Sequence, residues 1–463
     1  MKTARIGLLP LYIKLYDDVS PDSRRGVESF YNEAAGELSK LGLDVVKAPV
    51  CRIRDEFVEA VHNLEASDVD ALVTLHLAYS PSLESATAVA ASNLPVIIFD
   101  ATPEYDFSPG QSPEAIMYNH GIHGVQDFCN MLIRLGKPFQ IEAGHLYQSD
   151  VAKRVAALAR GCAIATAMRK ARVGLIGKPF DGMGDFQVPF DTLRHRIGLQ
   201  VVTPDNDTLK ACVAAVTDDE VSAEVKRNLS DFKSRNLDGG VHAETARVCL
   251  AVRKCIMKEQ MTAFSVNFMD ISDAGPITRM PFIEACRAMS EGIGYAGEGD
   301  ALTAAFVGAL MTQFPKTSFT EMFCPDWKNN TIFLSHMGEM NISLTAKQPV
   351  LTEMDFIYAS GHNPAVVYGM FMEGEAVFAN LAPGPTDSFS LIYTKGRMIG
   401  DGGKDNMPCT IRGWFDPGIP AADFLKRYSQ SGGTHHGAII YGDVRTELEA
   451  FAEAMGWKAV CIG

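Results

Sequence analysis

Three features are missing from this sequence: a hydrophobic run of membrane length, a C-x-x-C pair and an excess of basic residues. No apolar stretch approaches the roughly 20 residues that a membrane-spanning helix requires. The formal net charge is −14, whereas nucleic acids and anionic membranes bind proteins through a basic surface. We therefore expect no membrane and no nucleic acid among the partners of this protein.

The cysteines are scattered, and several, such as Cys212 and Cys249, lie in apolar stretches. This pattern favours buried, reduced thiols over disulfides or a zinc site. The first ten residues hold one short apolar run, with neither a signal-peptide core nor a cleavage pattern. A cytoplasmic enzyme is the expectation.

Apolar runs and amphipathic stretches alternate over the first third of the chain. This alternation predicts a parallel sheet covered by helices on both faces. The expected strands are Ile6–Leu9, Leu43–Val46, Ala71–Leu75 and Val96–Phe99, and the expected helices are Arg25–Lys40 and Asp55–Leu64. A long alanine-rich helix over about residues 150–171 closes this unit.

A second α/β unit and a β-rich unit follow. Strands at 172–177, 199–203 and 263–268, with helices near 218–233 and 243–260, predict the second unit. Beyond about residue 314, short strands between turns rich in glycine, proline and asparagine predict an antiparallel barrel or sandwich. We expect three domains, at 1–170, 171–314 and 315–463.

Four short motifs bring together carboxylates, imidazoles and small residues. They contain, in chain order, Glu298, Glu321, His336 with Glu339 close by, and the pair His435-His436. Two carboxylates and two histidines without a thiolate disfavour structural zinc. Such ligands suit Mn²⁺, with Co²⁺ or Mg²⁺ as substitutes, and they leave room for a polyol.

Each of these residues also has a purely structural interpretation. Glu298 fits an exposed acid in a loop between two helices, Glu321 a solvent-facing strand residue, and His336 a hydrogen-bonded core histidine. The glycine spacing from Gly292 to Gly299 resembles a dinucleotide-binding motif, which we reject because no strand is predicted before it.

Neighbouring side chains in a strand point in opposite directions. We therefore expect only one histidine of the pair His435-His436 to be a metal ligand. The other would face the surrounding shell or the core.

At these motifs the chain resembles the L-arabinose isomerase and L-fucose isomerase group, most closely its arabinose isomerase branch. The family patterns G-[FY]-A-G-E-G-D, S-F-x-E, S-H-M-x-E and [AS]-G-G-T-H-H correspond to Gly294–Asp300, Ser318–Glu321, Ser335–Glu339 and Ser431–His436. Weaker matches contain His76, His123 and His145. The family's T-G-S-Q-x-L-Y loop is replaced by Leu8–Tyr16, so the substrate-binding shell diverges.

The resemblance implies two flavodoxin-like, parallel-sheet α/β domains followed by a C-terminal antiparallel β-barrel-like domain. It implies that Glu298 and Glu321 bind the metal and act as acid and base, while His336 and His436 complete the coordination. The expected substrate-binding residues are His76, His123, His435 and Glu339. His123 is expected to reach the active site of a neighbouring subunit in a homo-oligomer, a hexamer or a trimer.

We therefore expect a metal-dependent aldose–ketose isomerase that acts on an unphosphorylated sugar of the pentose or 6-deoxyhexose type through a cis-enediolate. Which glutamate is the base and which the acid stays open. One alternative is an epimerase or lyase that uses the same metal site on a sugar acid or polyol. Another is a non-catalytic sugar-binding relative, and the retained glutamates and histidines count against it.

Overall fold

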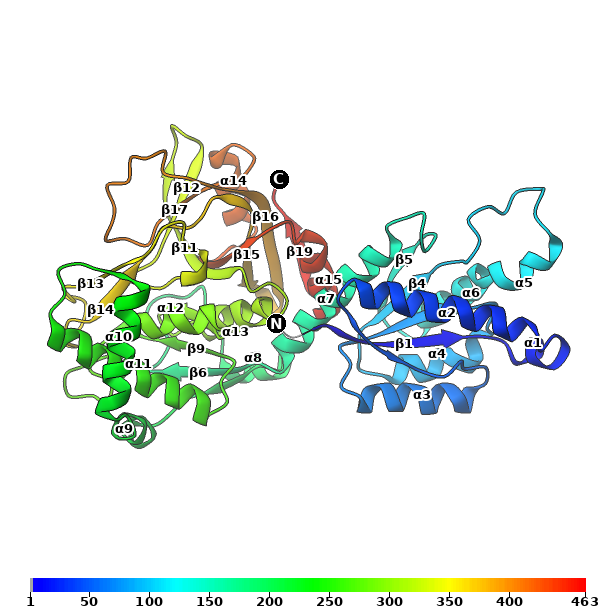
Figure 1. Cartoon of the computed structure of the whole chain (residues 1–463), viewed down its shortest axis with the longest axis horizontal. Helices are drawn as coiled ribbons and strands as arrows, with labels where there is room; N and C mark the ends of the chain where they lie inside the picture. Colours follow the sequence, from blue (N-terminus) through cyan, green and yellow to red (C-terminus); the bar gives the residue numbers. More distant parts are fainter. Residues whose placement is uncertain (1–2) are drawn as a thin grey trace. The chain divides into compact units, whose positions relative to one another are not determined.

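A computed structural model describes residues 3–463 of the chain, which form two compact units (Figure 1). One unit extends to Thr166 and includes Thr446–Ala454; the other comprises Ala167–Arg445 and Met455–Gly463. No helix among the described residues is both long and apolar enough to span a bilayer. The division into domains at residues 170 and 314 stays a prediction.

The N-terminal unit is built on a parallel sheet with the strand order β2-β1-β3-β4-β5, which is the order of flavodoxin-like folds. The strands are β1 (Arg5–Leu11), β2 (Asp44–Lys47), β3 (Ala71–His76), β4 (Val96–Asp100) and β5 (Gln140–Ala143). The helices are α1 (Lys14–Val19), α2 (Ser23–Lys40), α3 (Arg54–Ala66), α4 (Ser82–Ala91), α5 (Ile116–Asn119), α6 (Gly121–Arg134), α7 (Val151–Arg169) and α15 (Arg445–Met455).

Both faces of this sheet are covered, as Figure 1 shows for α2 and α3. Successive residues of β3 point to opposite faces of the sheet, and each face has its own hydrophobic core. Val73 packs with α2 and α7 on one face, and Leu72 packs with α3, α4 and α6 on the other. The central strands β1, β3 and β4 are mostly apolar because both of their faces are buried. Gly161 in α7 lets α15 pack closely, since a Cβ there would lie 2.5 Å from the Cβ of Ala450.

The second unit begins with another parallel sheet, in the order β10-β9-β6-β7. Its strands are β6 (Arg172–Ile176), β7 (Gln200–Val202), β9 (Ala263–Val266) and β10 (Gly294–Gly297). Its helices are α8 (Phe190–Arg196), α9 (Asn206–Ala214), α10 (Asp218–Asp231), α11 (Gly239–Lys258), α12 (Phe282–Ser290) and α13 (Ala301–Met311). The predicted parallel α/β architecture is therefore confirmed for both sheets.

Six antiparallel strands of the same unit close into a barrel, because β16 pairs with both β17 and β15. The barrel strands are β11 (Thr317–Asp326), β12 (Thr331–Ser335), β15 (Gly374–Pro383), β16 (Phe389–Ile399), β17 (Gly413–Asp416) and β18 (His436–Tyr441). Other elements are β19 (Lys458–Cys461) beside β16, the sheet of β14 (Ala365–Tyr368), β13 (Val350–Glu353) and β8 (Lys233–Ser234), and helix α14 (Ala421–Gln430). Of the two predicted β architectures, the barrel is confirmed.

Strand β10 was not predicted. The interpretation of Glu298 as an exposed acid in a loop between two helices is therefore wrong. Residues 294–297 pair in parallel with β9 along their whole length. Two glycines and an alanine carry little strand propensity, so the sheet context and the burial of Tyr295 decide the conformation. In a dinucleotide-binding motif the glycines follow a strand. Here Gly292 precedes β10 and Gly294 begins it, so the dinucleotide-binding interpretation remains excluded.

All ten cysteines are free. Six of them are buried, as expected for structural thiols, whereas Cys324, Cys409 and Cys461 are exposed. The prediction of reduced thiols is confirmed, and the prediction of burial is wrong for these three residues.

Candidate metal centre

Glu298 lies in the tight turn between β10 and α13. Its φ of +62° is left-handed, a conformation that costs a non-glycine residue about 1–3 kcal/mol. Two backbone hydrogen bonds hold the turn: Glu298 N donates to Val266 O at 3.1 Å, and Phe180 N donates to Glu298 O at 2.9 Å. At Gly299, with φ +83°, a Cβ would lie 2.6 Å from the carbonyl oxygen of Lys178. The strained turn leaves the Glu298 side chain only 12% exposed.

The register of the barrel brings Glu321 beside the histidine pair. Glu321 in β11 is the Cα partner of His436 in β18. Its Oε1 atom lies 3.3 Å from His435 Nε2 and 3.6 Å from His436 Nε2. Glu298 Oε2 lies 3.5 Å and 3.4 Å from the same two nitrogens. One donor atom from each of these four side chains lies within 4.8 Å of the other three, a spacing that could hold one metal ion.

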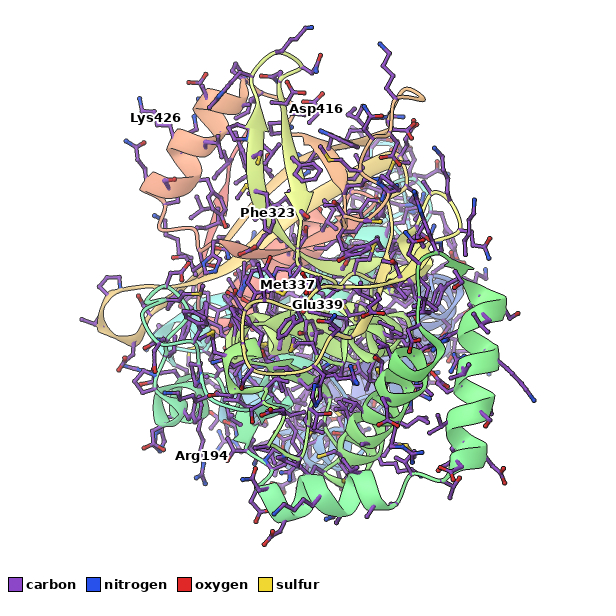
Figure 2. The ribbon with its side chains drawn as sticks, turned by 90° about the vertical axis from the view of Figure 1, so that its left-hand side faces the viewer. Arg194, Phe323, Met337, Glu339, Asp416 and Lys426 are labelled. Carbon is purple, nitrogen blue, oxygen red and sulfur yellow. The ribbon has the colours of Figure 1, made fainter. Side chains whose placement is uncertain are left out.

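His336 flanks this group from the end of β12. Its Nε2 lies 4.0 Å from Glu321 Oε2, and its Nδ1 lies 2.6 Å from Glu339 Oε2. Gly297 makes room for the ring, because a Cβ there would lie 2.7 Å from His336 Cε1. Glu339 also accepts a hydrogen bond from the Tyr295 hydroxyl at 2.8 Å. In Figure 2, Glu339 lies near the centre of this unit, in the segment that follows β12.

A carboxylate holds each of the three imidazoles at Nδ1. Besides Glu339 on His336, Asp300 Oδ2 lies 2.9 Å from His436 Nδ1 and Asp185 Oδ2 lies 2.6 Å from His435 Nδ1. Each carboxylate accepts a hydrogen bond from Nδ1–H, so each Nε2 is left to face Glu298 or Glu321. This carboxylate–histidine arrangement is common at metal sites, where it orients the ring and raises its basicity.

The ionisable groups of this site strongly shift one another's pKa values. Burial lowers the pKa of His436, but contacts with Asp300 and Glu298 outweigh it, and the pKa is raised. His435 behaves alike: burial is outweighed by Asp185 and Glu298, so its pKa is also raised. Burial raises the pKa of Glu298, yet contacts with His435 and His436 hold it well below the usual range. Protons and a metal ion would compete for the same imidazole nitrogens.

Two atoms of this site are buried without a hydrogen-bond partner: Glu298 Oε2 and His436 Nε2. Leaving a buried polar atom unsatisfied costs about 1–3 kcal/mol, and more if it is charged. A divalent cation would satisfy a carboxylate oxygen and an imidazole nitrogen together. The residues present therefore fit a divalent cation.

Of the four residues predicted to bind the metal, Glu298, Glu321 and His436 belong to the group whose donor atoms lie within 4.8 Å of one another, and His336 lies beside that group. The structure adds His435, whose ring centroid lies 4.3 Å from that of His436. The prediction that these two side chains point in opposite directions is wrong, because β18 begins at His436 and strand alternation does not reach His435. Both carboxylate oxygens of Glu339 are engaged, so its substrate contact stays a prediction.

His76 and His123 belong to the N-terminal unit. His123 in α6 stacks on Tyr79, with ring centroids 4.5 Å apart and planes inclined by 19°. His76 ends β3, and neither of its ring nitrogens has a hydrogen-bond partner. Their roles in substrate binding stay predictions.

We expect the stability of the chain to fall as the pH decreases below about 6.5, the pKa of an unfolded histidine. Burial lowers the pKa of His76 to about 3. Between about pH 3 and pH 6.5, the unfolded chain therefore binds a proton at this residue and the folded chain does not. His76 alone then lowers the free energy of unfolding by about 1.4 kcal/mol per pH unit. Urea unfolding at several pH values measures the slope, and a His76→Leu variant with the same slope as the wild type would contradict this account.

Three residues of the site were not predicted: Asp185, Phe186 and Asp300. Asp300 precedes a helix and accepts a hydrogen bond from Thr303 N at 2.8 Å, so its sequence position signals a helix cap but not the contact with His436. The Phe186 ring stacks on His436 with centroids 5.2 Å apart. Asp185 lies 250 residues from His435, and no sequence signal links the two.

Comparisons with known proteins point to one family. Models described as the L-arabinose isomerase central domain and the L-arabinose isomerase C-terminal domain match residues 192–314 and 316–458, together more than half of the chain. An L-arabinose isomerase of Acidothermus cellulolyticus is 24% identical, with 74% of this chain and 70% of that protein aligned. An L-arabinose isomerase of Tolumonas auensis is 25% identical, with 95% of this chain and 90% of that protein aligned. An L-arabinose isomerase of Shouchella clausii is 22% identical, with 98% of this chain and 93% of that protein aligned.

Proposed function

Because the chain belongs to the L-arabinose isomerase family, we propose that it is a sugar isomerase that interconverts an aldose and a ketose. The substrate is an unphosphorylated sugar of the pentose or 6-deoxyhexose type, and the reaction passes through a cis-enediolate. The observation that carries this proposal is the convergence of Glu298 and Glu321 with histidine Nε2 atoms within 4.8 Å. Glu298 lies in the matched central domain, and Glu321 lies in the matched C-terminal domain.

The residues that would hold the metal are Glu298, Glu321, His336 and His436. Their oxygen and nitrogen donors suit Mn²⁺, with Co²⁺ or Mg²⁺ as substitutes. When bound, the ion supplies electrostatic stabilisation of the negative charge that develops on the sugar oxygens.

The protein's own groups move the protons and orient the substrate. One of Glu298 and Glu321 removes the proton at C2, and the other handles the hydroxyl proton or returns the proton at C1. Burial raises the pKa of Glu298, but contacts with His435 and His436 outweigh it and lower the pKa, which keeps this carboxylate ionised, as a metal ligand must be. The His435 side chain is 35% exposed, against 0% for His436, so His435 meets the sugar.

The remaining substrate contacts and the assembly follow the family resemblance. His76, His123 and Glu339 belong to the substrate-binding set together with His435. The protein works in the cytoplasm as a homo-oligomer, a hexamer or a trimer. In this assembly His123 of one subunit reaches the active site of another.

A panel of sugars tests the proposal. Protein loaded with Mn²⁺ is incubated with each aldopentose, each 6-deoxyaldohexose and a set of sugar acids, and the products are followed by NMR. We expect one or a few aldoses to reach equilibrium with their ketoses. Epimers or cleavage products from sugar acids would support the epimerase or lyase alternative instead. Sugar binding without turnover would support the non-catalytic alternative.

A further inference from the structure

Asp185 reaches the metal centre from the loop between β6 and α8. Its Oδ2 atom accepts two hydrogen bonds from one residue, His435: one from the backbone N at 2.9 Å and one from the ring Nδ1 at 2.6 Å. The two bonds fix both the backbone and the rotation of the ring. The next residue, Phe186, lies against the same pair of histidines, 5.6 Å from the His435 ring centroid and 5.2 Å from that of His436.

His435 differs from the other two histidines of the site in its exposure. Its side chain is 35% exposed, whereas the side chains of His336 and His436 are 5% and 0% exposed. Its Nε2 nevertheless lies as close to Glu298 and Glu321 as that of His436 does. A ring that borders both carboxylates and is still accessible is placed to form a hydrogen bond with a sugar hydroxyl.

We propose that Asp185 is a positioning residue that holds His435 toward the sugar, so that this loop sets the affinity of the site for substrate and not for the cation. The inference rests on the proposed function. Asp185 accepts the hydrogen bond that Nδ1 donates, so Nε2 faces the space beside the two glutamates. Without Asp185, the His435 ring is free to rotate away or to carry its proton on the other nitrogen.

Asp300 provides the matched comparison. It makes the same type of contact, with His436 Nδ1 at 2.9 Å, but its side chain and that of His436 are both 0% exposed. The Nε2 atom of His436 is one of the two buried atoms without a partner. Asp300 therefore acts through a fully buried histidine, and Asp185 through the histidine of this site that is accessible to a sugar.

The experiment compares Asp185→Ala with Asp300→Ala. Loss of a carboxylate behind a ligand histidine typically costs about 10–100-fold in metal affinity or activity. We expect Asp300→Ala to lose about that factor in Mn²⁺ affinity, measured by calorimetry on metal-free protein. Asp185→Ala is expected to keep its Mn²⁺ affinity within about 3-fold and to lose about 10–100-fold in kcat/KM at saturating Mn²⁺. The sugar used is the aldose that the wild type converts fastest.

Two further variants sharpen the comparison. Asp181→Asn removes a charge from the same loop, at a side chain that is 80% exposed and pairs with Lys178, and we expect it to behave like the wild type. Adding Asp185→Ala to His435→Gln is expected to cause no further loss in kcat/KM, because Asp185 acts through His435. Additive losses would overturn the proposal, as would a drop in Mn²⁺ affinity in Asp185→Ala equal to that in Asp300→Ala.

A spectroscopic measurement separates this proposal from the proposed function. In protein labelled with ¹⁵N-histidine, the His435 Nδ1 resonance is expected to move when Asp185 is replaced by alanine and to stay in place in Asp181→Asn. If the wild type converts no sugar, the proposed function fails, and this spectrum still tests the bond to His435. An unchanged His435 resonance in Asp185→Ala would overturn the positioning role whatever the activity.

Discussion

Glu298→Gln is expected to lower turnover by about 10²–10⁴-fold, the contribution of a positioned acid or base, with a further loss from weaker metal binding. Glutamine keeps the shape of the side chain but removes the negative charge and the ability to take a proton. The same result is expected for Glu321→Gln, because both carboxylates border His435 and His436 at 3.3–3.6 Å. Initial rates at saturating Mn²⁺ and sugar measure the effect.

Glu244→Gln is the matched control, since Glu244 is exposed on α11. We expect its rates to equal those of the wild type. Thermal unfolding of all three variants shows whether the fold is retained. Near-normal turnover in a folded Glu298→Gln or Glu321→Gln protein would remove that residue from the catalytic machinery.

Removing the metal is expected to abolish activity, and adding Mn²⁺ is expected to restore it. Without a cation, Glu298 Oε2 and His436 Nε2 have no hydrogen-bond partner although both are buried. A cation that binds the folded chain alone also raises the free energy of unfolding, by about 2.7 kcal/mol at a concentration of 100 Kd. Activity and thermal unfolding are measured after chelation and after titration with Mn²⁺, Co²⁺ or Mg²⁺.

Two controls accompany the metal titration. Ca²⁺ prefers a larger set of oxygen ligands, so we expect it to restore much less activity than Mn²⁺. In Glu298→Gln the thermal shift on adding Mn²⁺ is expected to shrink, because one anionic ligand is gone. Full activity in protein shown to contain no metal would rule out the metal mechanism.

Local patterns were sufficient to predict most of the fold. Apolar runs such as Ala71–Leu75 become strands buried on both faces. Strand β10 was missed because its glycines have no strand propensity and only pairing with β9 makes it extended.

The motifs predicted which residues gather at the site, but not how each one is held. Glu298 and Glu321 each lie in a motif with small or loop-forming neighbours, and the structure places them together. The orientation of His435 could not be predicted, because it depends on where β18 begins and on an aspartate 250 residues away. Contacts of that kind depend on tertiary packing, which no local pattern encodes.

The central claim is that Glu298, Glu321, His336 and His436 bind one cation. Anomalous diffraction from a crystal soaked with Mn²⁺ locates the ion directly. We predict a single strong peak per chain, bounded by the two glutamates and by Nε2 atoms of the histidines. A peak held by other residues, or no peak at saturating Mn²⁺, would contradict the claim.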